Sequence, residues 1–146
     1  DNNPTGMLGA TWYMSQQDLK SLFNDLQPLN EEILIRSTQL YDRPIQASYS
    51  FQDDKLVQVI ASFKNEVKSI EELSDTFYVI QKLLSSDYGE MPEPIMNDII
   101  PPINERWTDQ EIVVSTKKMG RTTLVHRIMI KDNSAGEQVY MYLSKE

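Results

Sequence analysis

Two neighbouring stretches that alternate apolar and polar residues constrain the fold of this chain more than any other feature. They are "IQASYSFQ" (45–52) and "KLVQVIASF" (55–63), separated by Asp53-Asp54. Side chains of a strand alternate between two faces, so this pattern predicts a β-hairpin with the two aspartates in a tight turn. The apolar face is predicted to consist of Ile45, Ala47, Tyr49, Phe51, Val57, Val59, Ala61 and Phe63. The other face is mainly serine and glutamine, which indicates an antiparallel sheet with one side wet or covered by a polar partner.

A short amphipathic helix is predicted before this hairpin. Ser15 can cap it, and Asp18 three residues later comes close to a capping box. The apolar stripe is Leu19, Leu22, Phe23 and Leu26, and Pro28 ends the helix.

A second helix is predicted in "SIEELSDTFYVIQKLLSSDYG" (69–89). Ser69 and Glu72 form a full capping box, and Gly89 is placed to end the helix in a left-handed conformation. The predicted stripe is Leu73, Phe77, Ile80 and Leu84, widened by Val79 and Leu83.

The remaining strands are predicted at 31–38, 106–118, 121–131 and 137–145, with a second hairpin turning near Met119-Gly120. We therefore expect an α+β fold in the order α-βββ-α-βββ: two amphipathic helices packed on one face of a mainly antiparallel sheet of about six strands. A flexible tail (1–8) precedes a single domain (9–146). Its halves, 9–64 and 67–146, form a possible degenerate repeat without residue-by-residue identity.

The segment from Met91 to Asn104 contains four prolines, so it cannot pair as a strand over its whole length. It also carries apolar residues, among them Ile99 and Ile100. Either the loop caps an open end of the core or it offers these residues to a partner. We favour the cap, because Trp107 follows and needs cover.

Composition excludes several classes of site. The chain has no cysteine, so disulfides and thiolate metal sites are excluded, and its net charge of -8 disfavours nucleic acid. No stretch approaches the ~20 apolar residues of a membrane span. Neither a P-loop, a dinucleotide fingerprint nor a calcium loop is present, so no cofactor and no metal is predicted.

No catalytic residue is predicted either. The only histidine, His126, lies in mid-strand beside Leu124 and Ile128, where packing explains it better than catalysis. Two distant carboxylates meeting in space, as in a glycan hydrolase, are the enzymatic alternative.

The candidate partner surface is aromatic and apolar. Trp12 and Tyr13 stand directly before the Ser15 cap, either as a plug that seats the helix or as a binding platform. Tyr140 and Tyr142 share one strand face. With Ile99 and Ile100, these are the residues that we expect to contact a partner.

Several short motifs resemble one class of protein. "GATWYMSQQDLKSLF", "YSFQDDKLVQVIASF", "LLSSDYGEMP" and "RWTDQEIVV", spread over Gly9 to Val114, are similar to small exported bacterial α+β domains of the lipoprotein type. More loosely, the chain resembles the outer-membrane assembly lipoprotein BamE and the β-lactamase inhibitor proteins. It lacks their paired-helix start and the inhibitors' cysteines. The resemblance implies a protein-binding scaffold, and it assigns no functional residue.

The leading hypothesis is a non-enzymatic exported domain that binds another protein or a cell-envelope component. We expect it in the periplasm or at the cell surface, with a signal or lipid anchor upstream of Asp1; a trimmed sequence would start in the same way. The alternatives are the carboxylate-based hydrolase and an acidic, immunity-type inhibitor of a basic toxin.

Overall fold

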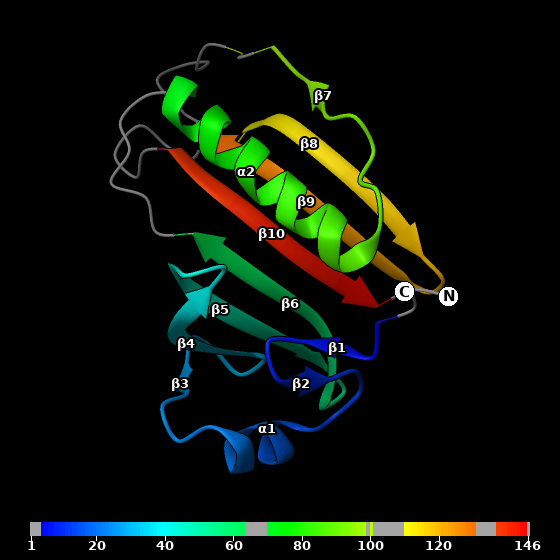
Figure 1. Cartoon of the computed structure of the whole chain (residues 1–146). Helices are drawn as coiled ribbons and strands as arrows, with labels where there is room; N and C mark the ends of the chain where they lie inside the picture. The colour runs from blue at the N-terminus through cyan, green and yellow to red at the C-terminus, as the bar shows by residue number, and fades with distance from the viewer. Residues whose placement is uncertain (1–3, 64–69, 99, 101–109, 131–136, 146) are drawn as a thin grey trace.

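The computed structural model describes residues 4–63, 70–98, 100, 110–130 and 137–145 (Figure 1). Two helices and ten strands lie within these residues. Their bounds are β1 Gly6–Met7, β2 Ala10–Thr11, α1 Gln16–Leu22, β3 Gln27–Pro28, β4 Ile33–Leu40, β5 Arg43–Gln52, β6 Lys55–Phe63, α2 Ile70–Tyr88, β7 Ile95–Met96, β8 Gln110–Met119, β9 Thr122–Ile130 and β10 Glu137–Lys145.

The main sheet is antiparallel and has eight strands in the order β3-β4-β5-β6-β10-β9-β8-β7, while β1 and β2 form a separate two-stranded ribbon. Each half of the chain contributes a helix, a two-residue edge strand and a three-stranded meander. The third strands of the two meanders, β6 and β10, pair with each other and join the halves at the middle of the sheet (Figure 1).

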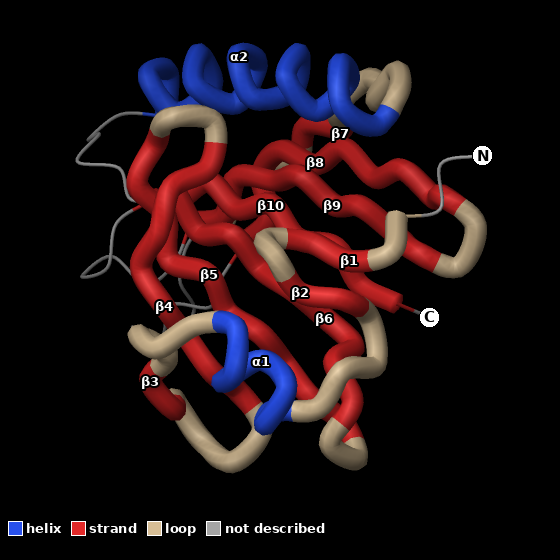
Figure 2. Tube along the Cα trace, turned by 60° about the horizontal axis from the view of Figure 1, so that its bottom comes forward, coloured by secondary structure: helices blue, strands red, loops and turns tan. Residues whose placement is uncertain are grey.

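The predicted fold class, with two helices packed on one face of a six-stranded sheet, is wrong. The described chain is mostly β. Two short segments that follow the helices pair at the outer edges of the sheet as β3 and β7, which the sequence did not indicate as strands. Pro28 is tolerated in β3 because an edge strand leaves one side of its backbone unpaired. In addition, α1 has only seven residues, and the β1–β2 ribbon lies beside it (Figure 2).

The 45–63 hairpin is confirmed, with both turn residues, Asp53 and Asp54, at positive φ. All four predicted inward residues of β5 are buried. In β6 the prediction for Val57 is wrong. Ser50 pairs with Gln58 but Phe51 pairs with Leu56, so Val57 is an extra residue in a bulge. The bulge turns Leu56 inward, and its side chain is fully buried.

The start of α1 is confirmed, because Ser15 and Asp18 form a capping box. The helix ends earlier than predicted, at Leu22, and Phe23 is already extended. Only Leu19 of the predicted stripe is fully buried, while Leu22 is 56% exposed. A helix of two turns presents only one position squarely to the sheet.

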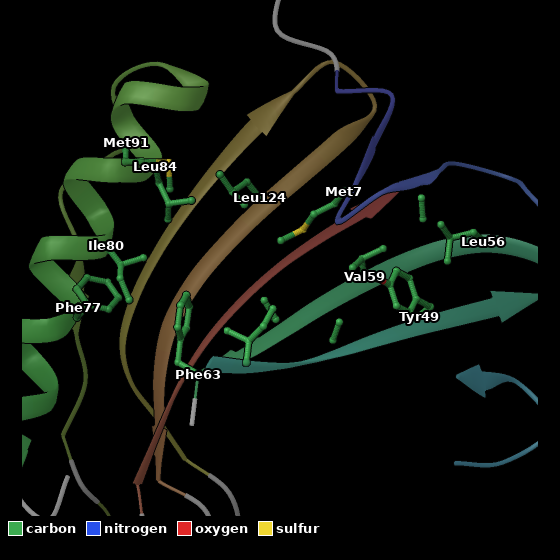
Figure 3. Close-up of a cluster of buried hydrophobic side chains, with 14 of the residues drawn as sticks. Met7, Tyr49, Leu56, Val59, Phe63, Phe77, Ile80, Leu84, Met91 and Leu124 are labelled. Atoms are coloured by element: carbon green, nitrogen blue, oxygen red, sulfur yellow. The ribbon is translucent and has the colours of Figure 1, made fainter. Parts of the chain in front are cut away.

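The stripe of α2 is confirmed for Leu73, Phe77, Ile80 and Leu84, all fully buried. Figure 3 shows Phe77, Ile80 and Leu84 on the side of the helix that faces the strands. Val79 and Leu83 do not widen it, since they are 48% and 37% exposed. Gly89 has φ of 86°, as the predicted helix end requires. The predicted N-cap, Ser69, lies outside the described residues.

Residues 4–8 pack against the sheet, where we expected a flexible tail. Gly6–Met7 form β1, and Met7 is buried in the same core as Val59 and Tyr49 (Figure 3). The Tyr49 hydroxyl donates to the carbonyl of Leu8 at 2.9 Å, and burial raises the pKa of this hydroxyl. The ribbon is therefore held directly to the sheet.

Candidate functional site

The helices and the ribbon all cover the same face of the main sheet. On one half, Phe23 after α1 stacks on Tyr49 of β5; on the other, Phe77 of α2 stacks on His126 of β9. Tyr49 of β5 pairs with Val59 of β6, Val59 pairs with Leu143 of β10, and Leu143 pairs with Leu124 of β9. Directly paired residues lie on one face of a sheet, and His126, two residues after Leu124, shares that face with Tyr49. The opposite face is left uncovered by every helix and ribbon that the structure describes (Figure 2).

A hollow of about 420 Å³ lies on this uncovered face. Its lining side chains come from the turn before β4 and from β4, β5, β6 and β9. They are Leu29, Ile33, Gln46, Ser48, Ser50, Gln58, Ile60, Ser62, Arg127 and Met129. Nine of the ten are uncharged and none is a carboxylate. A second, smaller hollow of about 220 Å³ shares Gln46 with it and reaches Asp25 and Arg36.

The one charged residue of the larger hollow has a partner beside it. Arg127 Nη1 lies 3.2 Å from a carboxylate oxygen of Glu111, and both side chains are about a third exposed, at 27% and 35%. The pair leaves the hollow with little net charge. In the smaller hollow, the guanidinium of Arg36 hydrogen-bonds Asp25 at 2.9 Å and lowers the pKa of that carboxyl.

Tyr140 and Tyr142 belong to β10, the strand between β6 and β9. Tyr140 pairs with Ser62 and Arg127, and Tyr142 pairs with Ile60 and Val125. Three of these four partners line the hollow. By backbone register, the two tyrosine positions therefore lie between the two strands, β6 and β9, that line the hollow.

The other predicted partner residues lie elsewhere. Trp12 is only 7% exposed, and its indole donates to the carbonyl of Pro4 at 3.0 Å, so it packs as a plug. Tyr13 is 50% exposed with φ of 71°, and its amide donates to Leu56 of β6. These two residues belong to the covered side of the sheet.

The described residues of the proline-rich segment, 91–98 and 100, follow the β8 edge. Ile100 exchanges two hydrogen bonds with the Gln110 side chain and is 61% exposed, while Ile99 lies outside the described residues. Ile95 and Met96 of β7 are also mostly exposed, whereas Met91 is buried. The cap interpretation therefore holds for Met91 alone among these described residues.

His126 is packed in the core, as predicted, and does not form a catalytic pair. Its Nδ1 lies 2.8 Å from Gln81 Oε1, and burial lowers its pKa to about 3. Ser115, the nearest hydroxyl in this network, donates to the carbonyl of Pro92 and accepts from Gln81. The imidazole is therefore separated from the hydroxyl by an amide that cannot act as a base.

Within the described residues, no group of three or more histidine and carboxylate side chains has a geometry that holds a metal ion. No described helix is long and apolar enough to cross a membrane. Neither a family profile, nor a curated protein, nor a solved structure matches the chain.

The residues of the hollow were not singled out from the sequence. The alternation at 45–63 predicted that Gln46, Ser48, Ser50, Gln58 and Ser62 face away from the core. The remaining signal is the lack of any charge at these five outward positions, which are normally rich in Lys and Glu in a strand open to water. That lack is typical of the middle of an interface.

Proposed function

We propose that this protein is a non-enzymatic binding domain and that the uncovered face of its main sheet binds another protein. The observation that carries the proposal is the hollow of about 420 Å³ on that face, lined by uncharged residues and one ion-paired arginine. A concave, weakly charged surface presented by rigid strands suits recognition of a protruding part of a partner.

The composition of the face supports this use. Ser48, Ser50 and Ser62 offer short hydroxyls that donate or accept, and Gln46 and Gln58 offer both amide functions. Ile60 and Met129 add apolar area between them. Serine with tyrosine, here at the register positions of Tyr140 and Tyr142, is also the mixture that antibody loops use to bind varied surfaces.

The chemistry of the hollow weighs against the hydrolase alternative. A glycosidase needs two carboxyl groups flanking the scissile bond, at most ~10 Å apart. None of the ten lining residues is an acid, and Glu111 beside the hollow is already paired with Arg127. The exposed acids of the two adjoining turns, 31–32 and 53, lie together at one end of the hollow and not on opposite sides of it. The buried, neutral His126 offers no general base on this face.

The proposal includes an exported location, in the periplasm or at the cell surface. Its support is the resemblance of the sequence to exported lipoprotein-type domains. An alkaline phosphatase fusion to the complete gene product tests it, because that reporter is active only after export. A fusion that is inactive in cells but folded in extracts argues against export.

Site-specific photo-crosslinking tests the binding face. A benzophenone amino acid is placed at Ser48 or Gln58 on the uncovered face, and at Val79 or Lys82 on the exposed side of α2 as matched controls. We expect a discrete crosslinked partner from the first two positions and none from the controls. Crosslinks to the same partner from α2 alone, or none from either face in cells that produce the protein, would refute the proposal.

A further inference from the structure

One end of the hollow is formed by a turn that carries two carboxylates. The amide of Leu29 donates to the carbonyl of Ile33 at 2.9 Å, which closes the turn between β3 and β4. Leu29 and Ile33 both line the hollow. Glu31 and Glu32, which lie between them in the turn, are exposed.

A second acidic turn lies directly beside the first. The amide of Phe51 donates to the carbonyl of Glu32 at 2.8 Å, which joins the end of β5 to the β3–β4 turn. Asp53 and Asp54 follow at the tip of the β5–β6 hairpin, and both are exposed. The hairpin is the same one that supplies Ser50 and Gln58 to the hollow.

Glu31, Glu32 and Asp53 form an acidic rim. The Asp54 carboxylate is not part of it, because its Oδ1 accepts from the amide of Gln16 at the start of α1 at 3.1 Å, and this bond fixes the hairpin tip in place. Lys55, the first residue of β6, is the one cation directly beside the two turns. The rim is therefore a preorganised negative margin next to an uncharged floor.

We propose that the partner of the uncovered face is basic: a protein segment in which an uncharged side chain enters the hollow and neighbouring Lys or Arg residues face the acidic rim. The inference rests on the proposed function and adds the chemistry of the partner to it. An uncharged floor bounded by charge is the usual anatomy of an interface, with the charge at the margin setting partner choice and association rate. The net charge of -8 acts in the same direction at longer range.

A selection from a random peptide library displayed on phage tests the partner's chemistry without assuming its identity. The folded protein is immobilised and peptides are selected at low ionic strength. We expect the enriched peptides to share an apolar or aromatic residue flanked by Lys or Arg. One enriched peptide, made synthetically, then serves as the probe in calorimetric titrations.

Three variants locate the binding of that peptide. Ser48→Tyr fills the hollow, and the double variant E31K/E32K reverses two of the three rim charges. The control E71K/D75K makes the same charge change at exposed positions of α2, on the covered side of the sheet. We expect each of the first two variants to weaken binding about tenfold or more, and the control to change it by less than about twofold. Thermal melts confirm that all three are folded.

The outcomes separate the two proposals. Enriched peptides that are acidic or uncharged but lose binding in Ser48→Tyr overturn the basic partner and leave the binding face standing. Peptides whose affinity is unchanged in Ser48→Tyr, or a selection without enrichment, overturn both. If E31K/E32K and E71K/D75K weaken binding equally, only the net charge matters and the rim is not part of the site. If added salt weakens peptide binding by the parent but not by E31K/E32K, this supports a direct contact between the rim and the basic residues of the peptide.

Discussion

The rings of Phe77 and His126 stack face to face, with centroids 3.9 Å apart and planes within 1° of parallel. The Gln81 amide nitrogen donates to Ser115 and to the carbonyl of Pro92, so its oxygen must be the acceptor from His126 Nδ1. Nδ1 therefore carries a proton, and burial, which lowers the pKa of His126 to about 3, keeps the ring neutral. This stack and its hydrogen bonds attach α2 to β8 and β9.

Acid should destabilise the protein through this histidine. Burial lowers the pKa of His126 from 6.5 to about 3 in the folded chain. Between these values the unfolded chain binds a proton that the folded chain excludes. The stability that neutral His126 contributes is thus complete above pH 6.5 and is lost as the pH falls toward 3. The expected slope is about 1.4 kcal/mol per pH unit in the free energy of unfolding.

The variant His126→Phe isolates this effect, because it keeps a stacked ring and removes the titration. Urea unfolding of both proteins from pH 7 to pH 4 measures the difference between them. We expect the parent to lose about 2–3 kcal/mol more than the variant over this range. Parallel curves would mean that His126 is not excluded from protonation in the folded state.

A neighbouring pair on α2 tests which face of the helix is buried. Leu84 is fully buried and Leu83 is 37% exposed. We expect Leu84→Ala to cost about 2–5 kcal/mol and Leu83→Ala less than about 1 kcal/mol, measured by chemical denaturation. Similar losses from both variants would show that the helix is rotated from the orientation described.

The sequence predicted those parts of the fold that local chemistry determines. The alternation at 45–63, the Ser15 cap, the end of the second helix at Gly89 and the turn at Gly120 each depend on neighbouring residues only. Patterns of this kind predict strands, caps and turns without any information about distant residues. The strands at 55–63 and 137–145 have the bounds that we predicted.

The features that failed depend on pairing between distant segments. Nothing local indicates that β6 pairs with β10, or that Gln27–Pro28 and Ile95–Met96 lengthen the sheet to eight strands. The apolar stripe of the first helix also failed beyond Leu19, because the helix stops at Leu22. Tertiary pairing decided each of these points, and a single sequence does not display it.

The candidate site was predicted only in outline. The sequence predicted a polar face at 45–63 and a tyrosine row at Tyr140 and Tyr142. It did not predict that the strands that carry them, β6 and β10, pair with each other in a single sheet. Trp12 was a candidate because it is a large aromatic residue, but large aromatic residues are found in cores as well as in binding surfaces. In the structure Trp12 is buried. Locating the hollow required the order of the strands, which brings β6 and β9 to either side of β10.

The bulge in β6 gives a prediction opposite to that of simple alternation. Alternation places Val57 in the core, whereas the bulge places Leu56 there with no exposed surface. We expect Leu56→Ala to lower the free energy of unfolding by about 2–5 kcal/mol, and Val57→Ala by about 1 kcal/mol or less. If Val57→Ala proves the more damaging change, the bulge is misplaced.

The β1–β2 ribbon depends on a glycine. A Cβ at Gly6 would lie 1.7 Å from the backbone oxygen of Ala10, a distance that forces the two strands apart. We expect Gly6→Ala to lower the melting temperature by several degrees, equivalent to about 1–3 kcal/mol, as the ribbon leaves the core around Met7. Thr5→Ala is the control, because exposed Thr5 contributes its carbonyl to Trp12 and the backbone is unchanged. A Gly6→Ala protein that melts like Thr5→Ala would contradict the packing of β1.

The two halves of the chain are also joined by a contact between Tyr41, in the β4–β5 turn, and Asp87, near the end of α2. The Tyr41 hydroxyl donates to the carboxylate at 2.6 Å, and burial, followed by this bond, raises the hydroxyl's pKa. We expect a double-mutant cycle of Tyr41→Phe and Asp87→Ala to give a coupling energy of about 1 kcal/mol. This is less than a buried hydrogen bond to a charged group would give, because the Asp87 carboxylate is exposed to water. Replacing Asp87→Ala by Ser86→Ala, a change at the adjacent exposed position, should leave the cycle additive within ~0.3 kcal/mol. Equal coupling energies in both cycles would mean that the β4–β5 turn is coupled to the end of α2 by general packing and not by this hydrogen bond.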